Sequence, residues 1–457
     1  MTDEVQLSTL SLWLGTCQSG HPKCMVEQDQ LYRPSRLIEV RSPGEENVCL
    51  VETKRFNSFT EEYMALSHCW GLSMPESAKT TSASLNSHLQ AIKLSDLPKT
   101  FVDFITIARG MDVPYVWIDS LCIIQDDLHD WQVQSAQMKS VYSSACLTIS
   151  AASAPDGSFG CRLGSKFAST GSALNFEWDG TPYSSEFGKG RIRLIPEIEW
   201  DITPTILFSD CPIQKRGWTF QEYELSPRVA SFCQEIIRWE CASLTASLYR
   251  PWGEPFFGKN LIAGLGEHEL GDEDQWHNMT TWTNLIQVYT MRQLTRQTDR
   301  LPAIGGIARK FGETFPSTFP GKYCAGIWES HGALGLLWEP EGRTGGVSRA
   351  TTDYIAPSWS WAALDRPASY GLPAPDSALL AEIISMEASP TGPDEYGMAS
   401  SGSLRIRGKV KKFQVAGMES HVYEGCLVVS DDVFARPQLD ELEKGLELEE
   451  DVLFLPE

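Results

Sequence analysis

Four side chains able to do chemistry occupy consecutive positions early in the chain: Ser67, His68, Cys69 and Trp70. An apolar run over residues 63–66 precedes them and Gly71 follows, a pattern typical of a strand that ends in a sharp turn. Strand ends at the edge of an α/β sheet are where such folds bind their ligands. A buried strand with internally hydrogen-bonded polar groups fits the pattern equally well, and both interpretations stay open.

A thiol nucleophile is one chemistry that this segment could support, with Cys69 as nucleophile and His68 as base. Adjacent residues of a strand point to opposite faces of the sheet, so these two side chains cannot easily meet. Cys69 would need another histidine as its base, for instance His21 or His129. Nothing in the sequence places either one beside it, so a Cys-dependent hydrolase is retained only as an alternative.

Metal-ligand chemistry occurs near the start of the chain, where Cys17, His21 and Cys24 have spacings that could bring them together around zinc. A structural zinc site needs four ligands, and the sequence shows no evident fourth; Cys49 is merely available. We favour a pair of packed thiols beside a loop histidine. A structural zinc ion held by Cys17, His21 and Cys24 remains the alternative.

Strands and helices alternate around these residues. We expect a hairpin over 36–40 and 48–52, a strand from residue 63, a helix over 98–110, a strand over 115–123, a helix between about 126 and 142, and a strand over 146–151. This order predicts an α/β fold with a parallel sheet flanked by helices. Strands over 228–232 and 236–241, helices between 274 and 311, and mixed α+β structure further on are also expected.

Charge and composition exclude several classes of protein. The formal net charge of −22 argues against a partner that is nucleic acid or an anionic membrane, since both need a basic surface. The first four residues carry acid where a signal peptide needs base, and no apolar stretch approaches membrane-spanning length. Twelve cysteines without a dense disulfide framework indicate reduced thiols. We therefore expect a cytoplasmic protein.

Five motifs in the expected order resemble the fungal heterokaryon-incompatibility (HET) domain family. They lie at residues 65–71, 97–100, 117–125, 130–142 and 216–222, the last reading Arg-Gly-Trp-Thr-Phe-Gln-Glu. Segments at 298–303 and 357–362 resemble segments that commonly follow the domain. On this resemblance we expect an N-terminal segment over 1–60, a HET domain over 61–250, a mainly helical region over 251–345, a β-rich region over 346–436 and an acidic tail over 437–457.

The resemblance implies a role in fungal non-self recognition, where incompatible partners trigger programmed cell death of fused cells. It also implies a core distantly similar to Toll/interleukin-receptor (TIR) domains. Some of those domains cleave NAD at the nicotinamide–ribose bond with a glutamate that follows a tryptophan. Trp218 and Glu222 are the analogous pair here, so Glu222 is the catalytic candidate and NAD the candidate substrate, by fold-level analogy. No cofactor is required for this reaction.

Cleavage of NAD requires a carboxylate that holds the ribose or stabilises the oxocarbenium ion as nicotinamide leaves. The residues expected to bind the substrate offer polar contacts, an aromatic face or a phosphate ligand: Ser67, Trp70, Asp119, Arg216 and Trp218. Each has a structural alternative. Glu222 could pair with Arg216 or cap a helix, and the two tryptophans could be core residues.

The chain departs from common family forms at Ile124, at His68 and at Gln134, where one frequent variant has glutamate. If that helix glutamate were the catalytic residue, this protein would be weakly active or inactive. A non-enzymatic HET domain would act as an interaction or assembly module. Its partner would be an unidentified protein or a second copy of the chain, and the motifs would then serve to stabilise the fold.

Overall fold

The computed structural model of the protein describes residues 3–24, 32–41, 44–56, 61–72, 74–161, 174–178, 190–194, 211–234, 236–248, 250–255, 275–340, 354–372, 381–411, 426–430, 433–435, 448–449 and 452–455. Residues 256–274 and 436–447, where we expected parts of the helical region and the acidic tail, therefore lie outside the described residues. Among the helices in these ranges, none has the length and apolar character needed to span a bilayer.

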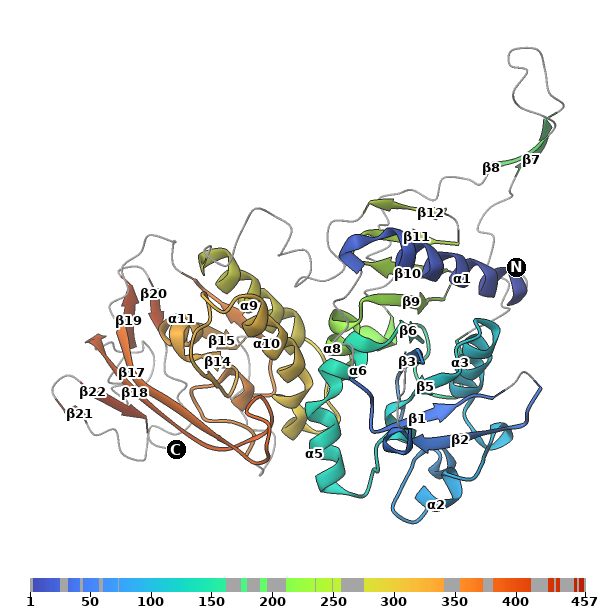
Figure 1. The fold of residues 1–457 in the computed structure, drawn as a ribbon. Helices are drawn as coiled ribbons and strands as arrows, with labels where there is room; N and C mark the ends of the chain where they lie inside the picture. The colour runs from blue at the N-terminus through green and yellow to red at the C-terminus, as the bar shows by residue number, and fades with distance from the viewer. Residues whose placement is uncertain are drawn as a thin grey trace.

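A ten-stranded sheet organises the N-terminal half, in the order β12-β11-β10-β9-β6-β3-β5-β1-β2-β4 (Figure 1). Its strands are β1 (Arg36–Glu39), β2 (Asn47–Glu52), β3 (Tyr63–Ser67), β4 (Ile92–Lys93), β5 (Tyr115–Trp117), β6 (Leu147–Ser150), β9 (Arg228–Phe232), β10 (Ile237–Cys241), β11 (Leu244–Ser247) and β12 (Arg250–Pro255). The α/β fold predicted from the sequence is confirmed. The expected hairpin β1–β2 belongs to the same sheet, because β1 pairs with β5.

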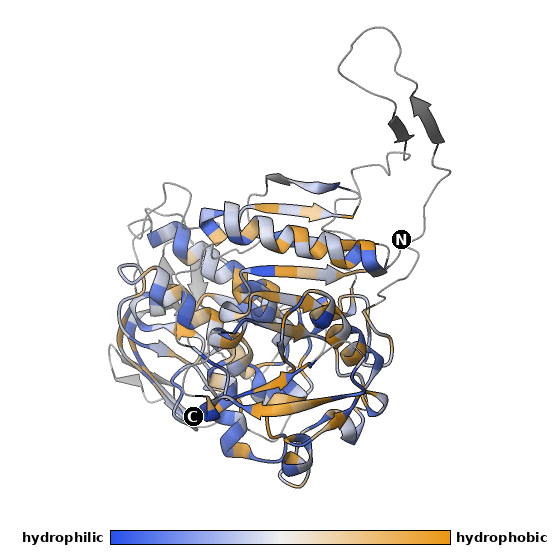
Figure 2. Cartoon of the chain, turned by 45° about the vertical axis from the view of Figure 1, so that its right-hand side comes forward, coloured by the Kyte–Doolittle hydropathy of each residue, from blue (hydrophilic) through white to orange (hydrophobic). Residues whose placement is uncertain are grey.

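The centre of this sheet is parallel and its two sides are antiparallel. Strand β3 pairs in parallel with β5 and β6, and β6 pairs in parallel with β9. Every residue of β3 and of β6 is buried, as expected for strands covered on both faces. Several strands of the sheet are correspondingly apolar along their length (Figure 2). The sheet is therefore mixed, with the predicted parallel arrangement confined to its four central strands.

The helix expected over 98–110 was predicted well, and the elements after it less so. Helix α3 (Lys99–Gly110) forms where Pro98 precedes an apolar face. The strand expected over 115–123 is wrong in length, because β5 ends at Trp117 and a short helix α4 (Asp119–Cys122) follows. The Asp119 carboxylate accepts a hydrogen bond from the Ser120 backbone N–H at 2.7 Å. An acid that accepts such bonds favours the start of a helical turn over the interior of a strand.

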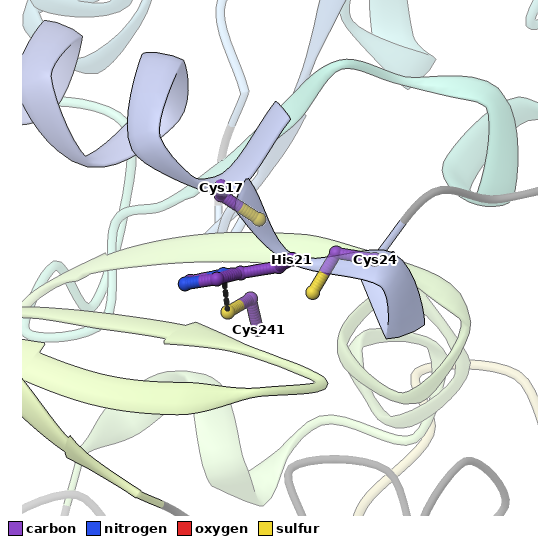
Figure 3. Close-up of side chains that lie close together, drawn as sticks. All are labelled: Cys17, His21, Cys24 and Cys241. Carbon is purple, nitrogen blue, oxygen red and sulfur yellow. Dashed lines mark hydrogen bonds between the residues drawn. The ribbon is translucent and has the colours of Figure 1, made fainter. Parts of the chain in front are cut away.

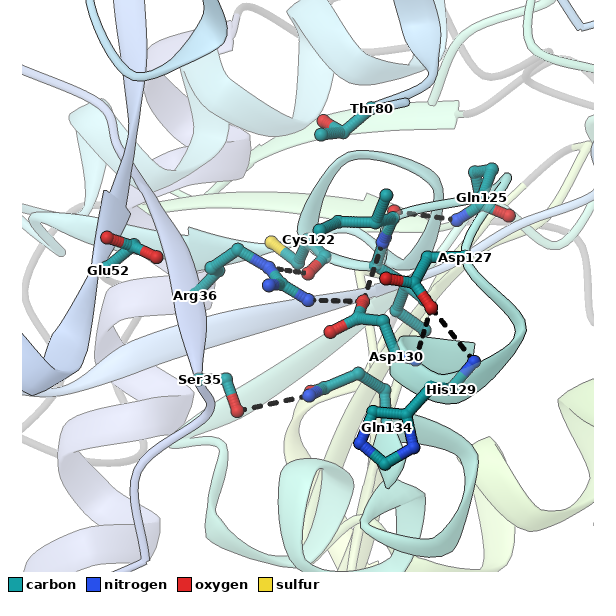
Figure 4. A network of polar contacts seen from close by, with 12 residues as sticks. Ser35, Arg36, Glu52, Thr80, Cys122, Gln125, Asp127, His129, Asp130 and Gln134 are labelled. Atoms are coloured by element: carbon teal, nitrogen blue, oxygen red, sulfur yellow. Dashed lines mark hydrogen bonds and ion pairs between the residues drawn. The ribbon is translucent and has the colours of Figure 1, made fainter. Parts of the chain in front are cut away.

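Two helices, α5 (Leu128–Ala136) and α6 (Met138–Ser144), replace the single helix expected between 126 and 142. Asp127 caps α5 by accepting hydrogen bonds from the backbone N–H groups of His129 and Asp130 (Figure 4). Asp130 forms an ion pair with Arg36 of β1 and also accepts a bond from the Ile124 backbone N–H at 2.8 Å. Asp130, in the first turn of α5, therefore attaches this helix to the sheet.

Helix α1 (Asp3–Gly20) lies across the antiparallel strands β10 and β11 (Figure 1) and was not predicted. The Trp13 ring lies 6.0 Å from the Trp239 ring of β10, and its indole N–H donates to the Pro251 carbonyl at 2.7 Å. Leu10, Leu14 and Cys17 are buried with it, at helical spacing. A turn of 3-10 helix (Pro22–Cys24) follows the end of α1.

The C-terminal half begins with helices α9 (Gln275–Thr290) and α10 (Pro302–Thr314), where helices were expected between 274 and 311. They lie between the helices of the sheet and the C-terminal strands (Figure 1). Helix α10 packs on α5, α6 and on α8 (Trp218–Leu225), and the Gly306 backbone N–H donates to the Gln221 amide oxygen of α8 at 3.2 Å. The helical region is thereby packed directly against the segment that contains Glu222.

Smaller elements complete the described parts of the chain. They are α2 (Leu85–His88), α11 (Gly332–Gly335), β7 (Leu174–Trp178), β8 (Gly190–Leu194), β13 (Tyr323–Cys324), β14 (Ile327–Trp328), β15 (Trp338–Pro340), β16 (Ala368–Tyr370), β17 (Ala381–Pro390), β18 (Ala399–Lys411), β19 (Cys426–Ser430), β20 (Val433–Ala435), β21 (Leu448–Glu449) and β22 (Val452–Leu455). Strand β18 pairs with β17, β19 and β22.

Candidate functional site

Ser67 and Glu222, which are 155 positions apart in the sequence, meet at the carboxyl end of β3. The Ser67 hydroxyl donates a hydrogen bond to Glu222 Oε2 at 2.5 Å. Ser67 is the last residue of β3, and the chain turns at Gly71 with a φ of 73°. A side chain at position 71 would meet Asp156, so glycine is required there. Glu222 is the fifth residue of α8 and does not cap it.

Burial, together with the nearby Asp119 carboxylate, raises the pKa of the Glu222 carboxyl to about 8. The hydrogen bond from Ser67, the Arg216 guanidinium and the Tyr142 hydroxyl act in the opposite direction. In the part of the chain that the structure describes, no ion pair joins Arg216 to Glu222. Glu222 therefore keeps its proton at neutral pH instead of being neutralised by a cation.

Asp119, which lies just after the end of β5, contacts two residues that lie just after the end of β3. Its Oδ2 accepts a hydrogen bond from the Trp70 indole N–H at 2.9 Å, and its Oδ1 lies 3.9 Å from His68 Nδ1. His68 is buried against the edge of the Phe101 ring, with 5.0 Å between ring centroids. Burial lowers the pKa of His68 to about 4, so the imidazole is neutral. The structure thus brings Ser67, Trp70 and Asp119 together with Glu222.

Arg216 lies just before α8, and Trp218 is the first residue of that helix. Both have partners in the segment that follows α9. The Trp218 indole N–H donates to Asp299 at 3.0 Å, and the Trp218 ring meets the Trp131 ring edge-on. The Arg216 backbone carbonyl accepts a hydrogen bond from Arg292 at 3.3 Å. The positive charge of Arg216 lowers the pKa of the Glu222 carboxyl. The partners of Trp218, in contrast, are Asp299 and Trp131, which lie apart from Ser67, Asp119 and Tyr142.

Cys69 lies in a separate apolar cluster with Cys211 and Cys233. Burial raises the pKa of the Cys69 thiol to about 11, so the nucleophilic thiolate is disfavoured at neutral pH. His129 is exposed on α5, and His21 lies beside Cys241. Neither His21 nor His129 therefore lies where it could act as the base for Cys69 in a Cys-dependent hydrolase.

The pocket lined by Ser67, beside the polar groups around Glu222, is small. Ser67, Ser150, Thr219 and Tyr223 contribute to its lining, and it has room for about one water molecule. Glu222 itself is 4% exposed. In this conformation the polar groups are assembled, and a dinucleotide does not fit beside them.

A second constellation lies on the other side of β9, where Cys241 of β10 joins the three candidate metal ligands. The ligand atoms of Cys17, His21, Cys24 and Cys241 all lie within 4.8 Å of one another (Figure 3). The three cysteines are at most 1% exposed. Cys49, the fourth ligand considered from the sequence, instead donates from its thiol to the Glu39 carboxylate at 3.3 Å in the β1–β2 hairpin.

Residues 63–222 match the family model described as heterokaryon incompatibility protein (HET). The chain contains a HET domain. The match supports a role in heterokaryon incompatibility and spans every residue of the polar cluster, from β3 to Glu222. No curated protein and no solved structure matches the chain, so the similarity to TIR domains stays a prediction.

Sequence reasoning missed three residues that complete these sites. Tyr142 of α6 lies beside Glu222 inside the HET domain, and the motif that contained it gave no sign of that role. Asp299 and Cys241 lie beyond the matched residues, and nothing in their spacing links them to Trp218 or Cys17. The only available signal for Cys241 was a cysteine at the end of a predicted strand.

Proposed function

We propose that this HET-domain protein is a cell-death effector in heterokaryon incompatibility and that it acts by cleaving NAD at the nicotinamide–ribose bond. The observation that carries this proposal is the buried Glu222 carboxyl, which is hydrogen-bonded to Ser67 at a strand end and lacks a neutralising ion pair. An acid in such surroundings costs folding free energy, and strongly shifted carboxyl groups of this kind cluster at functional sites.

The reaction needs negative charge beside the ribose, which Glu222 can supply on substrate binding. Nicotinamide in NAD is cationic, and an adjacent cation favours the ionised form of a carboxyl. The Glu222 carboxylate then stabilises the oxocarbenium ion that forms as the C–N bond breaks and its electron pair leaves with neutral nicotinamide. Water adds to the ribose carbon and loses a proton, which yields nicotinamide and ADP-ribose.

The neighbours of Glu222 fit subsidiary roles in this proposal. Ser67 orients the carboxyl through its hydrogen bond. Arg216 offers a guanidinium for a phosphate, and the Trp70 ring, which Asp119 fixes through the indole N–H, offers an aromatic face. Access requires displacement of the segment before α8, which Arg292 holds through Gln214 and Arg216.

Nicotinamide release from NAD by the purified full-length protein tests the proposal. We expect turnover by the unmodified protein and its loss in Glu222→Gln, which keeps the size of the side chain and removes its charge. Glu224→Gln, two residues further along α8, is the matched control and should keep turnover. Equal nicotinamide release by the unmodified protein and Glu222→Gln would exclude Glu222 from the mechanism.

A non-catalytic assembly module is the second candidate, favoured by the closed state of the site. Glu222 is 4% exposed and the adjoining pocket holds about one water. This candidate predicts that no assembly state releases nicotinamide, and that toxicity follows self-association across surface variants. Analytical ultracentrifugation combined with a viability assay distinguishes the two functions.

A further inference from the structure

We propose that Cys17, His21, Cys24 and Cys241 bind one structural zinc ion that fastens helix α1 to strand β10. None of the four residues lies within residues 63–222, so the inference is independent of the function proposed for the HET domain. Three thiolates and one imidazole form a ligand set that structural zinc sites use, with no position left open for substrate. The site would therefore stabilise the fold and take no part in catalysis.

The geometry of the four side chains fits a tetrahedral ion. They converge from the end of α1, the turn after it and the end of β10 (Figure 3). Their ligand atoms lie within 4.8 Å of one another, and His21 Nδ1 is 3.5 Å from the Cys241 sulfur. Sulfur ligands around a tetrahedral zinc lie roughly 3.8 Å apart, so a small inward movement of the side chains completes the site.

Arg228 of β9 supplies the charge that such a site needs in the core. Zinc with three thiolates and a neutral imidazole carries one net negative charge, and burying it alone is unfavourable. The buried Arg228 guanidinium donates to the Cys17 sulfur at 3.1 Å and to the Cys24 carbonyl at 2.8 Å. The cation therefore touches a proposed ligand atom directly and balances the charge of the loaded site.

Further donors surround the Cys24 sulfur. The Ser243 hydroxyl lies 3.5 Å from it, and the Ala242 backbone N–H hydrogen-bonds to the same atom. Both residues belong to the turn that immediately follows Cys241, between β10 and β11. Hydrogen bonds of this kind orient metal ligands and tune their affinity. The end of β10 thus provides one ligand, and the turn that follows it supports a second one.

The consequence for the fold is a link between distant parts of the chain. All of the matched residues 63–222 lie between Cys24 and Cys241, so closing this loop through a metal restricts the unfolded chain more than a local link would. Apart from this cluster, the Trp13 ring of α1 packs on the Trp239 ring of β10. Removal of zinc should therefore loosen α1 first.

Metal analysis of the full-length protein, purified under reducing conditions with zinc in the growth medium, tests the proposal. We expect about one zinc per chain. After replacement of zinc by Co²⁺, the visible spectrum should show the intense bands of a tetrahedral, thiolate-rich site. A metal content below about one tenth per chain, even after incubation with Zn²⁺ alone, overturns the proposal. So does finding these cysteines joined in disulfides.

Variants identify the fourth ligand. Cys241→Ser should reduce zinc to below about one tenth per chain, whereas Cys49→Ser, the matched control in the β1–β2 hairpin, should keep the full content. The opposite result would assign the site to Cys49 and contradict the proposal. If Cys241→Ser does not fold, Cys241→His retains four ligands and should keep zinc with a shifted Co²⁺ spectrum. Arg228→Gln should weaken zinc affinity about 10-fold or more in competition with a chelator.

Discussion

The indole N–H of Trp218 donates a hydrogen bond to the carboxylate of Asp299 at 3.0 Å. This bond joins the last motif of the HET domain to the segment that precedes α10. Asp299 is the last residue of a turn of 3-10 helix in that segment (Gln297–Asp299). The tryptophan that made Glu222 a candidate by analogy therefore has a structural partner outside the matched domain. Its ring is held in place before any ligand binds.

The Trp218–Asp299 bond should couple the stability of the two regions. Trp218→Phe keeps an aromatic ring but leaves the partly buried Asp299 without its indole donor, so we expect a loss of about 1–3 kcal/mol in the free energy of unfolding. Urea unfolding measures it. In a double-mutant cycle with Asp299→Ala, which removes the acceptor, the two losses should sum to more than the loss in the double variant. Additive effects would show that the bond contributes nothing.

Glu222 should make the protein less stable as pH rises. Its pKa is raised from 4.5 to about 8 in the folded state, so the folded state binds this proton more tightly than the unfolded state does. The resulting stabilisation is complete below pH 4.5 and is lost as pH rises through about 8. We expect a loss on the order of 4 kcal/mol across this window, measured by urea unfolding at a series of pH values.

Glu222→Gln should flatten that dependence. The variant should unfold at higher urea concentration than the unmodified protein at about pH 9, because no buried carboxylate forms. Glu224→Gln, two residues further along the same helix, provides the comparison for replacing one carboxyl of α8 by an amide. Parallel stability curves for the unmodified protein and Glu222→Gln would show that Glu222 titrates normally.

His68 should make the protein sensitive to acid. Its pKa is lowered from 6.5 to about 4 by burial, so the unfolded state binds the proton first as pH falls. The stability contributed by the neutral imidazole is present above pH 6.5 and is lost as pH falls through about 4, by up to about 3 kcal/mol. Urea unfolding between these pH values should show the loss in the unmodified protein.

A His68→Phe variant keeps an aromatic ring against Phe101 and removes the titrating group, so it should lack this component of acid unfolding. His129→Gln on the exposed surface of α5 serves as control. If His68→Phe and the control lose stability at the same rate below pH 6.5, the buried imidazole is not the source.

Arg36 should matter far more to stability than surface arginines do. Its ion pair with Asp130 is largely buried, with 8% and 14% of the two side chains exposed. Arg36→Ala leaves a buried carboxylate without its cation, and we expect a loss of about 3–5 kcal/mol in the free energy of unfolding. Arg55→Ala breaks an exposed pair with Glu52 and should cost less than about 1 kcal/mol. Equal losses in urea unfolding would contradict this difference.

Local patterns predicted the centre of the fold because each element there depends on its own residues. The apolar runs of β3 and β6 and the amphipathic face of α3 were sufficient, and Gly71 indicated the turn at the strand end. Helix α1 was missed although Leu10, Trp13, Leu14 and Cys17 have the spacing of a buried helical stripe. That signal was present in the sequence and unused.

The candidate sites were harder to predict because they depend on contacts between distant residues. The motifs named Ser67 and Glu222, but the hydrogen bond between them depends on how α8 packs over the end of β3. Cys241 is separated from Cys24 by the whole HET domain, so no local pattern could associate them. Asp119 was placed inside a strand because one acid in an apolar run does not show where the strand stops.

The strand order has a practical consequence for work on isolated fragments. Of the ten strands, β3, β4, β5 and β6 lie within residues 63–222, while β1 and β9, which cover the outer sides of β5 and β6, lie outside. A polypeptide cut to the matched residues would expose unpaired backbone N–H and C=O groups along two apolar strands. Such edges recruit other chains, so self-association seen with that fragment would reflect missing neighbours instead of signalling assembly.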